Sequence, residues 1–219
     1  MSDHDGAATS ARAERARTSL TGLACGDALG RPVDGDAAAA VRDRYGRVTE
    51  MLGADGRRAG TTTSPTAAAV RSAERLVNGS APAESTSADR SRSAACSPPP
   101  LAAGVPYGYI AGPADDRAAA AAEAVERGGG DGDGGEAAAS LAVVVGELVD
   151  GKSITDAVST AATVAVARSA PVPLRETLAA VGDRGAVSIS PRGDRSAVFE
   201  TALHEAVAAA DAEEAIVSA

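Results

Sequence analysis

A glycine-rich stretch over residues 19–35, S-L-T-G-L-A-C-G-D-A-L-G-R-P-V-D-G, constrains the fold of this chain more than any other. Apolar residues that lead into it (Ala13, Ala16, Leu20, Leu23) recur at three- and four-residue steps, which is the period of one helix face. The next position on that stripe is Asp27. Because burying an unpaired charge is costly, we interpret Asp27 as a structural buried acid with hydrogen-bond donors or a cation beside it.

Three glycines on this stretch, Gly22, Gly26 and Gly30, are spaced four residues apart. A glycine inside a helix costs up to about 1 kcal/mol relative to alanine. Three such costs on one line predict that another backbone lies close to this helix. Pro32 is expected to end it.

Helical periodicity recurs along the rest of the chain, and no segment shows the alternation of a strand, so the sequence predicts an all-α fold. We expect a disordered tail over residues 1–10 and a single all-α domain over residues 11–219, with a flexible Ser/Pro-rich loop at about residues 80–100. Within the domain, helices are predicted at residues 37–44 with Asp36 as cap, 63–77, 115–127, 136–149, 154–168 with Ser153 as cap, 174–181, 197–209 and 212–217.

Two segments contain a proline within or beside a possible helix. At Thr63-Ser64-Pro65-Thr66, Thr63 or Ser64 is expected to cap a helix, and Pro65 suits its first turn. Residues 101–110 are predicted as a short mixed element only, because Pro106 and two glycines weaken the helical pattern.

The composition of the chain argues against several classes of partner and site. The chain has 30 acidic and 21 basic residues, a net charge of -9 and no basic cluster, which argues against a nucleic-acid partner. Alanine richness and a single lysine, Lys152, are typical of a salt-loving, GC-rich source or of plain genome bias. The polar start and short apolar runs predict a cytoplasmic protein without a membrane span. Two cysteines are too few for a disulfide framework or zinc site.

A family resemblance rests on three segments in order: G-L-A-C-G-D-A-L-G-R-P-V-D at residues 22–34, Tyr45-Gly46, and the threonine-led helix at residues 61–76. Together they resemble the N-terminal part of the ADP-ribosylglycohydrolase family. Weaker similarity continues at residues 94–104, 137–157 and 197–219. The resemblance implies an all-α fold, two magnesium ions, and hydrolysis of the bond between ADP-ribose and an acceptor, with ADP-ribosylated protein or ADP-ribose as partner.

The resemblance also implies which residues would form the site. Family members hold magnesium mainly through a T-D-D-T box and a second G-G-D-x-D-T box near the C-terminus. Here the first box reads Thr63-Ser64-Pro65-Thr66, so both aspartates are missing and Thr63, Ser64 and Thr66 are the remnant metal positions. Asp34 stands where the family carries a catalytic acid near the metals. No segment of this sequence matches the second box.

Other family segments are altered too. The G-N-G-x-x-M-R segment is reduced to S-A-A-C-S at residues 93–97, and the T-H motif is replaced by G-G-G-D at residues 128–131. Magnesium is a hard ion that takes oxygen ligands, commonly carboxylates and waters. With these groups missing, we expect weak magnesium binding or none.

Three hypotheses remain open. The first is a degenerate, truncated family member without catalysis, the second a module that binds ADP-ribose or a related nucleotide without hydrolysing it, and the third an active hydrolase completed by another chain. Missing carboxylates count against the third and the altered Gly-rich segments against the second, so the first is favoured. Two of the candidate residues also have purely structural interpretations. Asp27 would be a hydrogen-bonded buried acid, and Asp34 would be a turn residue.

Overall fold

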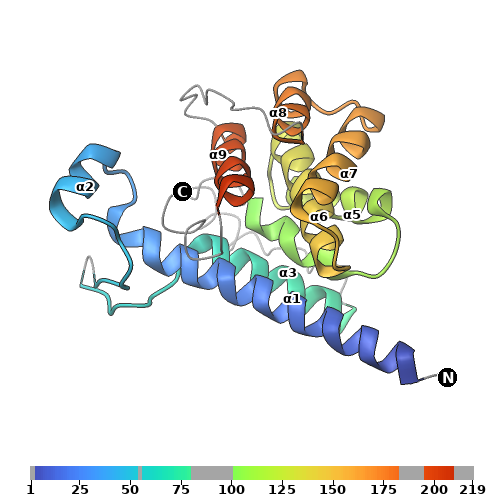
Figure 1. The fold of residues 1–219 in the computed structure, drawn as a ribbon, viewed down its shortest axis with the longest axis horizontal. Coiled ribbons are helices and arrows are strands. Elements are labelled where there is room, and N and C mark those ends of the chain that lie inside the picture. The colour runs from blue at the N-terminus through green and yellow to red at the C-terminus, as the bar shows by residue number, and fades with distance from the viewer. Residues whose placement is uncertain (1–2, 54–55, 80–100, 183–194, 210–219) are drawn as a thin grey trace.

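The computed structural model describes residues 3–53, 56–79, 101–182 and 195–209, and within these ranges every regular element is a helix (Figure 1). This confirms the all-α prediction. The elements are α1 (Asp3–Gly30), η1 (Arg31–Val33), α2 (Ala38–Tyr45), α3 (Ser64–Asn78), η2 (Leu101–Tyr109), α5 (Ala114–Arg127), α6 (Gly132–Val149), α7 (Ile154–Ala167), α8 (Val172–Gly182) and α9 (Arg195–Ala208).

Several sequence-based expectations concern residues outside the described ranges. They are the loop at residues 80–100, the altered family segment at residues 93–97, Cys96, and the last predicted helix at residues 212–217.

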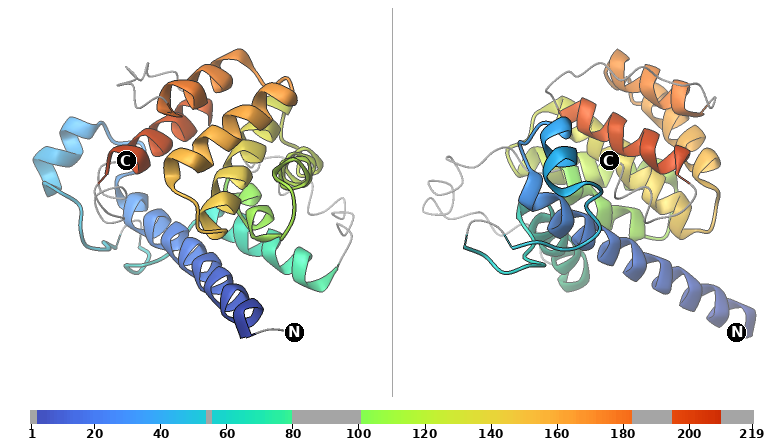
Figure 2. Two further views of the ribbon diagram at one scale, coloured as in Figure 1. Left: turned by 45° about the vertical axis from the view of Figure 1, so that its right-hand side comes forward. Right: turned by 60° about the vertical axis from the view of Figure 1, so that its left-hand side comes forward.

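Helix α6 lies in the middle of the helical body, with α5, α7 and η2 packed against it (Figures 1 and 2). The core around it consists of valine, leucine and many alanines, and Val143, Val158 and Leu178 are fully buried. Because alanine side chains are short, helices that meet through them approach closely. The core is thus built from small aliphatic residues in close contact.

Helix α6 begins at Gly132, four residues before the predicted start. Asp131 caps it, since its Oδ1 accepts a hydrogen bond of 2.8 Å from the Gly134 backbone N–H. Gly134 and Gly135 are buried, and a Cβ at Gly135 would lie 3.1 Å from the Glu126 side chain. The glycines just before the predicted start therefore belong to the first turn of a helix in tight contact with α5.

The segment at residues 101–109 is a 3-10 helix, η2, buried from Ala102 to Gly108. Runs of this length are uncommon for the 3-10 form. The two glycines let this segment approach α6 closely, because a Cβ at Gly104 would lie 2.8 Å from the Ala138 carbonyl oxygen and one at Gly108 2.6 Å from that of Ala142. The residues that weakened the sequence pattern are those that let η2 lie against α6.

Helix α1 runs along the edge of the body beside α3, and its N-terminal end projects beyond it (Figure 1). Residues 3–10 of the expected disordered tail are the first turns of α1, and alanines such as Ala7 and Ala8 favour this helical continuation. Among the described side chains of α1, Ala28 alone is buried, so the apolar stripe of this helix is only partly covered. At Gly22 and Gly30 an added Cβ would meet nothing within 4 Å, so no backbone of the described residues lies close there.

The ends of the other helices follow the sequence in part. Ser153 caps α7 through a 3.1 Å hydrogen bond from the Asp156 backbone N–H, as predicted. Gly46 and Gly79 follow α2 and α3 with positive φ, which suits glycine. Asp36 is not the cap of α2, however, because Ala37 occupies that position without a side-chain hydrogen bond.

In the described ranges, no helix combines the length and the apolar character that crossing a membrane requires.

Candidate functional site

The candidate site is the N-terminus of α3, where the side chain of Asp27 from α1 meets two threonines. Its Oδ2 accepts hydrogen bonds from the Thr63 backbone N–H at 2.7 Å and from the Thr66 hydroxyl at 2.6 Å. The Thr66 N–H lies 3.4 Å from the same oxygen. Its Oδ1 accepts from the Thr63 hydroxyl at 2.5 Å. The predicted donors beside Asp27 are thus present.

This arrangement corrects the predicted cap of α3. Thr63 occupies the N-cap position, but its own side chain makes no capping hydrogen bond. The carboxylate of Asp27 takes the place of the Thr63 side chain and accepts hydrogen bonds from backbone N–H groups that lack partners within α3. A negative charge is also favoured at a helix N-terminus by the helix dipole. Asp27 therefore joins α1 to α3 as a cap supplied by another helix.

Two opposing effects set the pKa of Asp27. Burial raises the pKa, because it disfavours the charged form. The hydrogen bonds from the Thr63 and Thr66 side chains and backbone together outweigh burial, so the pKa of Asp27 lies below its ordinary value. Asp27 is half-buried, and its carboxylate is held in the charged form.

The other predicted site residues lie apart from this cluster of contacts. Ser64 is exposed at the start of α3. Asp34 is exposed at the end of η1, where its backbone N–H donates to the Arg31 carbonyl and Gly35 follows with φ of 84°. The geometry is that of a turn. Among the contacts of the described residues, none joins Asp34 to Asp27.

The side chains at this site are not the ligands that magnesium prefers. Thr63 and Thr66 each donate their hydroxyl proton to Asp27, and Asp27 already accepts from four groups. Pro65 offers no side-chain ligand. Among the described residues, no group of three or more His, Cys, Asp or Glu side chains is placed to hold a metal ion. Within the described part of the chain, the groups at the N-terminus of α3 therefore do not fit a two-magnesium centre.

A second charged cluster, which we call the arginine network, was not predicted. Arg117 of α5 is 3% exposed and pairs with Glu147 of α6 at 3.3 Å and with Asp150 at 2.6 Å. Arg12 of α1 also pairs with Asp150, and Lys152 lies 2.6 Å from Glu147. Burial lowers the pKa of Arg117, and the charge of Arg12 lowers it further.

A sequence signal for this network existed. Arg117 shares a helix stripe with Ala121 and Val125, and Glu147 shares one with Val143, all of them buried. A charge on an apolar stripe predicts a buried partner, as it did for Asp27. Two complementary charges on neighbouring helices would have indicated the pair.

The fold and this site define an all-α protein in which a carboxylate from the first helix caps the N-terminus of another. The model of the ADP-ribosylglycohydrolase family matches residues 8–95, the segment that contains α1, α2 and α3. The match confirms the resemblance for this segment, which is less than half of the 219 residues. Curated proteins and solved structures gave no match.

We expect Asp27→Asn to lower the free energy of unfolding at neutral pH by about 1–2 kcal/mol, the cost of losing a helix cap. The folded-state pKa of Asp27 is lowered, so ionisation of this group stabilises the fold above the unfolded-state pKa. That stability is lost as the pH falls through the folded-state pKa. Urea unfolding at a series of acidic pH values should show the difference between wild type and variant shrinking as the pH falls.

Asp36→Asn is the matched control, because Asp36 is exposed and lies outside this contact. It should leave the free energy of unfolding within about 0.5 kcal/mol of wild type. Equal effects of the two variants at neutral pH would contradict the capping role of Asp27.

Proposed function

We propose that the chain is an ADP-ribosylglycohydrolase-like protein that retains the N-terminal scaffold of the family without its magnesium-dependent hydrolysis. The observation that carries the proposal is the contact of Asp27 with Thr63 and Thr66. In the family these threonine positions flank two aspartates of a metal box. In this chain they donate hydrogen bonds to a protein carboxylate.

The chemistry of the remaining groups supports this proposal. Hydrolysis assisted by two metals needs carboxylates to fix the ions and a water between them. Asp34 is exposed in a turn, and Ser64 offers a single neutral oxygen. The contact that this part of the chain does make is the set of hydrogen bonds by which Asp27 joins α1 to α3.

The test is calorimetric titration with magnesium and with ADP-ribose, beside a hydrolysis assay on ADP-ribosylarginine. We expect no release of ADP-ribose above the protein-free background and no saturable heat with magnesium. Release that disappears on addition of a chelator, and that Asp34→Asn abolishes, would refute the proposal and select an active hydrolase. Saturable binding of ADP-ribose without turnover would select the nucleotide-binding alternative.

A restoring variant tests the same point in the opposite direction. Ser64→Asp with Pro65→Asp returns two carboxylates to the N-terminus of α3, where magnesium prefers such ligands. We expect this double variant to gain a magnesium signal in calorimetry that the wild type lacks. Ser64→Asn with Pro65→Ala is the uncharged control. A magnesium signal of equal size in wild type, control and restored variant would contradict the assigned role of the missing aspartates.

A further inference from the structure

The N-terminal half of α1 is attached to the body by arginines. The Arg12 guanidinium donates to the carbonyl oxygens of Tyr109 at 3.2 Å and Ile110 at 3.0 Å and pairs with Asp150. Arg15 donates to the Val149 carbonyl at 3.2 Å. These carbonyls lie at the C-terminal ends of η2 and α6, where cations are favoured. We call these contacts of Arg12 and Arg15 the arginine clamp.

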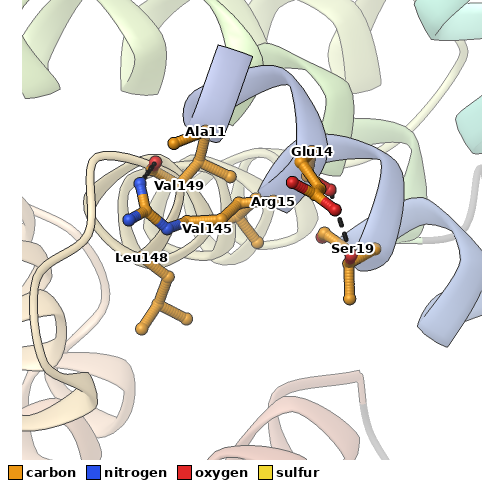
Figure 3. A pocket seen from close by; sticks show the side chains of 8 residues that line it. Ala11, Glu14, Arg15, Ser19, Val145, Leu148 and Val149 are labelled. Carbon is orange, nitrogen blue, oxygen red and sulfur yellow. Dashed lines mark hydrogen bonds between the residues drawn. The ribbon is translucent and has the colours of Figure 1, made fainter. Parts of the chain in front are cut away.

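The described residues make little apolar contact with the middle of α1. Between α1 and α6 lies an open groove of about 640 Å³, lined on one side by Ala11, Glu14, Arg15, Thr18 and Ser19 and on the other by Val145, Leu148 and Val149 (Figure 3). The Tyr109 hydroxyl donates to Ser19 at 3.2 Å. Polar contacts therefore hold this part of α1, and burial contributes little.

Breaking the clamp leaves no buried charge without a partner. Asp150 keeps its 2.6 Å contact with Arg117, and Arg117 keeps Glu147. The Arg12 side chain is 21% exposed and that of Asp150 31%, so water reaches both. Release of α1 thus avoids the large cost of isolating a buried ion.

We propose that α1 is a strap: it opens away from α6 when the arginine clamp breaks, while η2, α5, α6 and α7 stay folded. The Asp27 contact with α3 remains as the attachment at the other end of α1. Opening widens the groove and exposes its apolar wall of Val145, Leu148 and Val149. Local opening of this kind occurs in elements with few buried apolar contacts. The strap is independent of the proposed loss of hydrolysis.

Hydrogen exchange on the full chain, read by mass spectrometry in separate α1 and α6 peptides, tests the strap. We expect Arg12→Gln to accelerate exchange in α1 about tenfold, as expected when a charge-assisted contact is lost, and to change α6 by less than about twofold. In roughly 1 M NaCl, where the screening length is about 3 Å, wild type should approach the variant.

Arg17→Gln is the matched control, because Arg17 is an exposed arginine on the same helix and the substitution removes the same charge. It should leave α1 exchange near wild type. Equal acceleration of α1 and α6 by Arg12→Gln would mean that α1 leaves only on global unfolding and would overturn the strap. Unchanged exchange in both helices would overturn it as well, because the clamp would then not hold α1.

Discussion

Arg117→Met is expected to lower the free energy of unfolding by about 3–5 kcal/mol, the usual cost of removing one member of a buried ion pair. The side chain of Arg117 is 3% exposed, and that of Glu147 is 7% exposed. Without Arg117, the Glu147 carboxylate keeps, among the described residues, only its contact with the half-exposed Lys152 at Oε2. Urea unfolding followed by far-UV circular dichroism measures the loss.

Arg127→Met is the matched control, since Arg127 lies on the same helix in a solvent-exposed pair with Glu123. Its effect should stay below about 1 kcal/mol. A double variant, Arg117→Met with Glu147→Leu, removes both buried charges and should recover part of the loss. An Arg117→Met loss no larger than that of Arg127→Met would contradict the buried pair.

The sequence was most informative for features that depend only on neighbouring residues, such as helix type and helix caps. The all-α class and the Ser153 cap depend on a few neighbouring residues, and the structure has them where they were expected. Asp27 was also identified as an acid that needs donors. Its partners, Thr63 and Thr66, lie 36 and 39 residues further along the chain, so the sequence did not identify them.

The errors at glycines share a physical cause. Each glycine was interpreted from its own stretch of sequence: Gly22 as a close approach, Gly104 and Gly108 as weakening a helix, and Gly134 as lying before a helix. Whether a glycine serves close packing depends on the surface opposite it, and that surface belongs to another helix. Gly22 faces open space, whereas Gly104 and Gly108 face the backbone of α6. Such pairings between distant segments require the tertiary structure.

Gly108→Ala is expected to lower the free energy of unfolding by about 3 kcal/mol, at the upper end of the usual cost of overpacking a core. An added Cβ would lie 2.6 Å from the Ala142 carbonyl oxygen, 2.9 Å from the Gly146 nitrogen and 3.0 Å from the Val145 Cβ. Two of these are backbone atoms of α6, which cannot rotate away as a side chain would. Relief therefore requires η2 to move off α6.

Gly22→Ala provides the opposite case on α1, because its Cβ would meet nothing within 4 Å and the helix would gain a better helix former. We expect it to raise the free energy of unfolding by up to about 1 kcal/mol. Both variants replace glycine by alanine, so a comparison of their free energies of unfolding, measured by chemical denaturation, separates the effect of helix propensity from that of packing. The sign of the change should differ between them. A stabilising Gly108→Ala would show that η2 does not lie against α6 as closely as described, and the basis for a buried 3-10 helix at residues 101–109 would be lost.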